Sequence, residues 1–141
     1  MRAPVIQSLP LVPALLLGAL NLPAGGAEVP PAVAKAFEHY IALPDALVPV
    51  LREVQSAESA EAAAPKLRAL LTQVLDVRRE IEGIQKFDPG VEEEVHRRYE
   101  MPMRQGWGRV YDEVYRLQKV RCYENVAFFK QFQTLCMFLS Q

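Results

Sequence analysis

Residues 60–84 read AEAAAPKLRALLTQVLDVRREIEGI, and this stretch decides the fold. Its apolar positions alternate in steps of three and four, at Ala60, Ala63, Leu67, Leu70, Val74, Val77, Ile81 and Ile84. That spacing keeps one stripe on one side of a helix, where it faces a partner helix as in a coiled coil. The stretch therefore predicts an amphipathic helix within a helical bundle.

Towards the N-terminus, residues 31–54 show the same spacing, at Val33, Phe37, Tyr40, Leu47, Leu51 and Val54. Pro44 occupies the seam position between Tyr40 and Leu47. Because proline removes a backbone donor and clashes with the preceding turn, we expect this helix to kink or restart at Pro44. Ser56 and Ser59 are both candidate N-caps of the next helix, of which Ser59 is favoured, and a start at Pro65 is the alternative.

Towards the C-terminus, Asp88-Pro89-Gly90 predicts a turn that opens a shorter helix, which ends before Pro102. A long last helix is expected from about Met103. Its apolar stripe shifts phase from Trp107, Val110, Val114 and Leu117 to Cys122, Val126, Phe129, Phe132, Cys136 and Leu139. The predicted fold class is all-α, an antiparallel up-down bundle of three long helices plus one shorter helix.

The first 27 residues have the features of a signal peptide. A short positive start precedes the apolar stretch 11–20, and small residues lead to a cleavage site after Ala27. The apolar stretch is about half the ~20 residues that span a bilayer, which argues against a membrane anchor. We therefore expect a mature domain of residues 28–141, located in the periplasm or secreted, with no membrane span.

Composition supports a single folded domain. The chain has 141 residues, of which 50% are hydrophobic and 23% charged. Lysine and arginine total 16 against 17 aspartates and glutamates. Because such a balance creates no strong field, no nucleic-acid partner is expected.

The two cysteines, Cys122 and Cys136, lie in a stretch without Gly or Pro after Gly108, so we place both on one unbroken helix. Fourteen residues of helix separate them by roughly 21 Å, which excludes a disulfide between them. We interpret both as small buried hydrophobic residues. The alternative is an intermolecular bond that would make a homodimer.

Residues 59–67, SAEAAAPKL, resemble a segment that recurs in small exported helical proteins of planctomycete-like bacteria. The resemblance implies an exported helical fold. It carries no activity, cofactor or site residue over to this chain.

One pattern suggests a metal site. Glu93 and His96 have the Glu-x-x-His spacing of di-iron bundles, in which residues three apart share a helix face. Such sites need a second copy, and His39 has no glutamate three residues before it. The favoured interpretation is a solvated, ion-paired face of Glu92, His96 and Glu100. We expect no cofactor, and we expect no enzyme activity because no nucleophile motif accompanies either histidine.

The stretch most like a binding site is residues 96–109, HRRYEMPMRQGWGR. Proline and two glycines should break the helix there and let side chains converge. The candidate binding residues are Arg97, Arg98, Tyr99, Arg104, Trp107 and Arg109, which suit an anionic ligand or partner. The alternative is structural, with Trp107 in the core and the arginines paired with Glu92, Glu93 and Glu94.

These patterns favour an exported, non-enzymatic helical bundle that acts as an interaction or structural module. Its partner would be an unknown protein or anionic molecule of the cell envelope. The alternative is a small-ligand or metal-binding bundle that uses Glu93 and His96.

Overall fold

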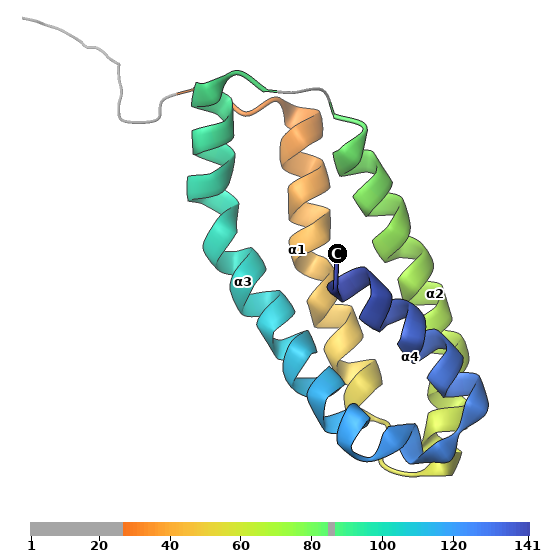
Figure 1. Ribbon diagram of the computed structural model, residues 1–141. Coiled ribbons are helices and arrows are strands. Elements are labelled where there is room, and N and C mark those ends of the chain that lie inside the picture. Colours follow the sequence, from red (N-terminus) through yellow and green to blue (C-terminus); the bar gives the residue numbers. More distant parts are fainter. Residues whose placement is uncertain (1–26, 85–86) are drawn as a thin grey trace, which may run out of the picture.

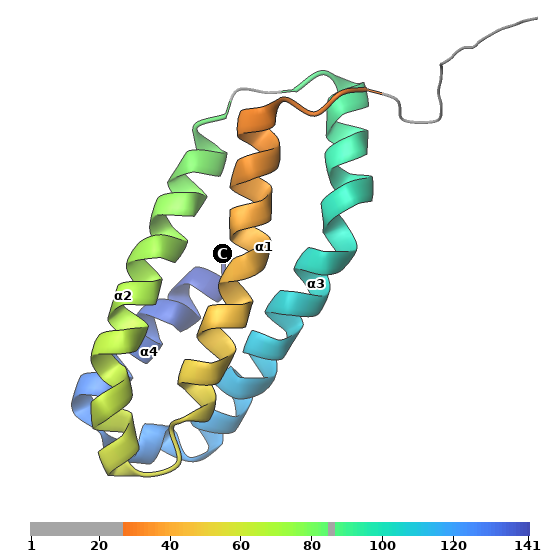
Figure 2. The same cartoon turned by 180° about the vertical axis from the view of Figure 1, so that it is seen from behind.

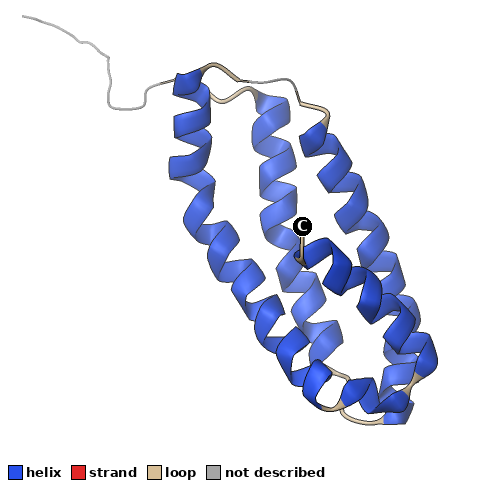
Figure 3. Ribbon diagram, in the orientation of Figure 1, coloured by secondary structure: helices blue, strands red, loops and turns tan. Residues whose placement is uncertain are grey.

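The structure, a computed structural model, describes residues 27–84 and 87–141, so the proposed signal peptide lies outside it except for Ala27. The described chain forms α1 (Pro31–Arg52), α2 (Ala57–Glu82), α3 (Pro89–Lys119), the short helical turn η3 (Arg121–Glu124) and α4 (Val126–Leu139). No strand occurs in these two ranges (Figure 3). The predicted all-α class is confirmed.

The helices run alternately up and down the long axis of the molecule (Figure 1). Viewed from behind, α1 lies between α2 and α3, and it packs against both (Figure 2). The short helix α4 folds back and packs against α2, while its backbone stays away from α3. The predicted bundle of three long helices and one short helix is therefore confirmed, although the short helix is the last one.

The main core is built from the apolar stripes of all four helices. The stripe in α2 faces inward as predicted, and Ala60, Ala63, Leu67 and Val74 are fully buried. The shorter α4 buries Phe128, Phe132, Leu135 and Phe138. A smaller cluster, made of Val29, Val33, Val95 and Tyr99, joins the beginnings of α1 and α3.

Two prolines that were expected at the ends of helices lie inside continuous helices. Pro44 does not restart α1, which continues through it to Arg52. Its ring is buried against Gly106 of α3, where an added Cβ would lie 3.2 Å from the Pro44 Cγ. The packing of α1 on α3 at this close approach compensates for the hydrogen bond that proline removes.

Pro102 likewise does not separate two helices, because α3 runs unbroken through it. The buried side chains of Tyr99 and Trp107 flank this exposed proline and hold both halves of α3 in the bundle. At the start of α2, the N-cap is Ser56 and not Ser59 or a start at Pro65. Ser56 accepts from the Ser59 backbone N–H at 3.1 Å, and the Ser59 hydroxyl accepts from the Ser56 N–H in return.

The predicted long last helix is also wrong, because the chain reverses between Val120 and Asn125. Four consecutive residues, Arg121 to Glu124, have φ between 52° and 59°. A left-handed residue costs about 1–2 kcal/mol, so the turn costs roughly 4–8 kcal/mol. Burying the four large side chains of α4 contributes about 6–12 kcal/mol, which is sufficient to offset the strain.

Asn125 fixes the direction of α4 after the turn. Its side-chain oxygen accepts from the Phe128 N–H at 2.8 Å and so caps α4. Its amide nitrogen donates to the Glu61 carboxylate at 2.8 Å, which ties the start of α4 to the start of α2. Within the described part of the chain, no helix combines the length and apolar character that crossing a membrane requires.

Candidate functional site

The predicted arginine junction does not form a convergent site, because α3 is continuous there. Arg97, Arg98, Arg104 and Arg109 lie along a regular helix, and each is paired with a carboxylate. Arg97 and Arg98 both donate to the buried Glu94, with the Arg97 Nε at 3.0 Å from its Oε1. The Arg97 hydrogen bond, assisted by Arg98, holds the pKa of Glu94 below its usual range.

The other two arginines are paired as well. Arg104 donates to Glu100 one turn earlier in the same helix. Arg109 reaches across to α1 and donates to Asp45 at 3.0 Å. The structural alternative expected the arginines to pair with Glu92, Glu93 and Glu94, and of these three Glu94 accepts their hydrogen bonds. These pairs leave the patch nearly neutral, so an anionic ligand would have to compete with carboxylates already in place.

The two aromatic residues of the patch belong to the core. Trp107 is 6% exposed, and its ring centroid lies 5.1 Å from Tyr40 and 5.6 Å from Phe138. Tyr99 is buried and stacks on Phe37 at 5.5 Å. The structure thus places Trp107 as the core anchor that the structural alternative expected.

The two residues suggested as metal ligands, Glu93 and His96, are exposed, and His96 is paired with Glu100. His96 Nε2 lies 2.9 Å from Glu100 Oε1, one turn along α3, and the His96 side chain is mostly exposed. Glu93 is exposed as well. No group of three or more metal-ligating His, Cys, Asp or Glu side chains is found in residues 27–84 and 87–141.

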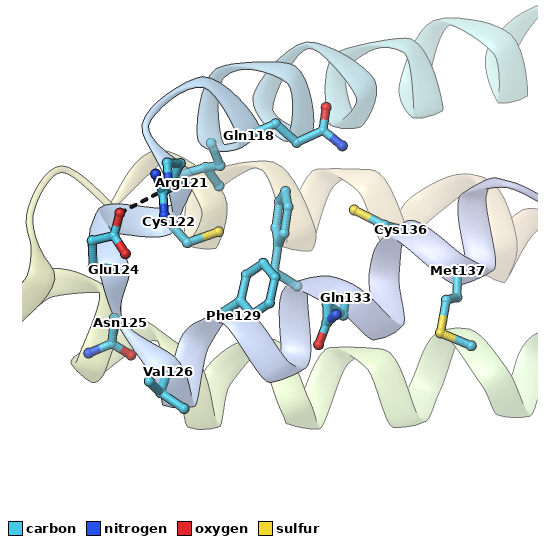
Figure 4. A pocket seen from close by; sticks show the side chains of 12 residues that line it. Gln118, Arg121, Cys122, Glu124, Asn125, Val126, Phe129, Gln133, Cys136 and Met137 are labelled. Carbon is cyan, nitrogen blue, oxygen red and sulfur yellow. Dashed lines mark ion pairs between the residues drawn. The ribbon is translucent and has the colours of Figure 1, made fainter.

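A concave surface lies elsewhere, between the end of α3 and α4. A cavity of about 560 Å³ is lined mainly by apolar side chains, among them Leu117, Phe129, Phe132 and Met137 (Figure 4). Small-ligand sites typically measure ~300–1,000 Å³ and are mostly apolar, so this cavity is within that range. Its charged lining residues, Arg121 and Glu124, are paired with each other at 3.0 Å.

Both cysteines line this cavity. The helix reversal brings Cys122 from the turn and Cys136 from α4 to the same hollow, so the sequence argument that a long helix separates them fails (Figure 4). Both are free thiols. Burial raises the pKa of the Cys122 thiol to about 11 and also raises the pKa of Cys136. Because the thiolate is the reactive form, these are poor nucleophiles at neutral pH.

Two further hollows continue this cavity along α4. One of about 260 Å³ shares Gln118 and Cys136 with it. The next, of about 510 Å³, shares Tyr111 and Leu139 with the second hollow. We call the three together the α3–α4 groove. It follows α4 along its length because the two helix backbones stay apart.

The sequence carried a partial signal for this groove. Val126, Phe129 and Cys136 continue a three-four stripe, which the sequence analysis assigned to the core. Of this stripe the structure buries Phe132, together with Phe128, Leu135 and Phe138, whereas Val126 and Phe129 are exposed. The groove was missed because the reversal at Arg121–Glu124, which rotates the stripe to the surface, was not foreseen.

The fold and groove define the class of protein, a small all-α bundle with an open apolar groove between two antiparallel helices. No family model matches the chain, and no curated protein or solved structure is detectably similar to it.

Proposed function

We propose that this chain is an exported, non-enzymatic interaction module that recognises its partner through the α3–α4 groove. The observation that carries the proposal is the distribution of exposed apolar side chains. Six of the eight large hydrophobic residues exposed in the described chain lie on the second half of α3, the turn and α4: Tyr111, Tyr115, Val120, Val126, Phe129 and Met137.

Such a concentration is typical of a recognition surface. Exposed apolar side chains scattered singly are normal, but a contiguous group beside a hollow marks an interaction site. Tyrosine, phenylalanine and methionine are also enriched in protein interfaces. The paired arginines of residues 97–109 are a weaker candidate, because binding there would disrupt ion pairs that already exist.

Export is supported by the leader pattern of residues 1–27. Fractionation of a bacterium that expresses the full chain tests it, with N-terminal sequencing of the recovered protein. We expect a product that starts at Glu28 outside the cytoplasm. A cytoplasmic product that retains Met1 would contradict export.

A pair of methionine variants tests the groove. Met137 is 65% exposed on α4 beside the groove, whereas Met101 is 57% exposed on α3 outside it. Met137→Glu should remove the proteins that the wild type captures from a cell-envelope extract, and Met101→Glu should retain them. Equal capture of proteins by both variants would refute the groove as the binding surface. Loss only on combined replacement of Arg97, Arg98 and Arg109 by alanine, none of which lines the groove, would favour the arginine patch.

A second function, binding of a small apolar ligand, is favoured by the 560 Å³ cavity beside Phe129. An environment-sensitive apolar dye should then bind one to one and be excluded by Phe129→Glu. Dye binding that is unaffected by this substitution would exclude the cavity as the site.

A further inference from the structure

Helix α4 has more apolar surface than α2 can cover. Its sequence, VAFFKQFQTLCMFL, contains a single charged residue, Lys130. One stripe is buried in the core, and the remaining apolar side chains stay at the surface: Val126 is 77% exposed and Phe129 is 44% exposed. The apolar surface of α4 therefore extends beyond its buried stripe, and such a flank is expected to be covered by a partner.

The same surface offers both protruding and receiving elements. Val126 and Met137 protrude from α4, and the groove that borders them is hollow along the whole helix. A two-fold interface requires one patch to be complementary to itself, with knobs and holes on the same face. We propose that the α3–α4 groove is the interface of a homodimer, in which α4 of each copy packs into the groove of the other. This inference rests on the proposed function of the groove.

The area available suits a stable dimer. A large aromatic side chain contributes roughly 150–250 Å² when fully buried, so the half-exposed Tyr111, Tyr115 and Phe129 present on the order of 300 Å². Val120, Val126 and Met137 add smaller areas. The polar side chains between them add to this total. A standard interface buries about 800 Å² on each partner, and these side chains supply a large part of that area.

The charges are compatible with a second copy. Near a two-fold axis each side chain meets its own counterpart, so a charge at the centre would face a like charge. The cavity that contains Val126, Phe129 and Met137 of this patch is lined by neutral side chains apart from Arg121 and Glu124, which neutralise each other at 3.0 Å. Lys119 lies over the Tyr115 ring at 4.9 Å and Lys130 is exposed on α4, and both lie outside the lining of this cavity.

The dimer is expected to be non-covalent. Cys122 is 1% exposed and Cys136 is half-buried, so neither thiol is freely available to a second chain. This differs from the disulfide-linked dimer considered from the sequence. A reducing agent should therefore leave the association unchanged.

Sedimentation equilibrium over a concentration series, with and without reductant, tests the dimer. The wild type should sediment at twice the chain mass in both conditions. Met137→Glu and Val126→Glu should each weaken association at least tenfold, because a carboxylate would enter an apolar interface. Met101→Glu should leave it unchanged. Val126 starts α4, where a carboxylate is favourable beside the helix N-terminus, so that variant keeps the monomer folded.

The possible results are distinguishable. Three results would overturn the homodimer. The wild type is monomeric at every concentration, or reductant dissociates the dimer, or neither groove substitution weakens the dimer. If the wild type is monomeric but Met137→Glu abolishes partner capture or Phe129→Glu abolishes dye binding, the dimer fails and the groove remains a recognition surface. If association, capture and dye binding are all indifferent to these substitutions, both proposals fail.

Discussion

The left-handed turn at Arg121–Glu124 predicts that glycine will be better than arginine at position 121. Arg121 has φ of 53°, where glycine has no steric penalty. The substitution Arg121→Gly should relieve about 1–2 kcal/mol of strain. It also removes an ion pair between exposed side chains, worth about 0–1 kcal/mol, and adds roughly 0.5–1 kcal/mol of chain entropy to the unfolded state.

The matched control is Gln105→Gly, because Gln105 is an exposed residue in the interior of α3. There the backbone is right-handed, so glycine brings only its entropic cost and should destabilise by about 0.5–1 kcal/mol. The unfolded-state cost is common to both variants and cancels between them. When Glu124→Gln removes the Arg121 ion pair from both backgrounds, Arg121→Gly should be about 1–2 kcal/mol more stable than Gln105→Gly, which corresponds to roughly 4–8 °C in melting temperature.

Thermal and urea unfolding followed by circular dichroism measure this difference. Both substitutions should be made in a Met137→Glu background, so that self-association does not contribute to the measured stability. If the two glycine variants are equally destabilised, Arg121 does not adopt a left-handed conformation and the reversal between α3 and α4 is incorrect.

Three other predictions concern buried polar groups and thiols. Arg116→Met should cost about 2–3 kcal/mol in urea unfolding, because Arg116 donates to the Leu51 and Val54 carbonyls at 2.8 and 3.0 Å; a cost below 0.5 kcal/mol would contradict this cap on α1. Cys122, with its pKa raised to about 11, should be alkylated at pH 8 at least ~100-fold more slowly in the folded chain than in the chain unfolded by urea. The contribution of the neutral thiol to stability should be lost as pH rises from ~8.5 towards 11. Equal labelling rates in the two states would argue against a buried thiol. Because Arg97 lowers the pKa of Glu94, ionised Glu94 stabilises the fold above the ordinary glutamate pKa, and that stability is lost as pH falls through the lowered pKa. Glu94→Gln should therefore reduce the loss of stability at acid pH. An unchanged loss would rule out this ion pair as its cause.

The helical class and the buried face of α2 were predictable because they depend on local periodicity. Ala60, Leu67 and Val74 repeat with the helix period, and nothing in their surroundings opposes it. The pairing of Arg97 with Glu94 is local in the same way, because residues three apart meet on a helix surface. The pairing of Arg109 with Asp45 joins two helices and has no such local signal.

The errors occurred where tertiary packing decides the local structure. Pro44 ordinarily interrupts a helix, but its contact with Gly106 depends on a residue 62 positions away. The turn from Arg121 to Glu124 contains neither glycine nor asparagine, so its left-handed backbone has no sequence signature. The groove was missed for the same reason, because it exists only if the chain reverses at that turn.

The reversal, on which the groove depends, can be tested without any substitution by nuclear Overhauser effects from the single tryptophan. The ring centroids of Trp107 and Phe138 lie 5.6 Å apart, and the Tyr111 hydroxyl donates to the Leu139 carbonyl at 2.8 Å. In one continuous helix Trp107 and Phe138 would be roughly 46 Å apart. We expect cross-peaks between these two rings within a single chain, verified by isotope filtering. Their absence, together with unbroken helical amide contacts from Lys119 to Val126, would contradict both the fold of α4 and the groove.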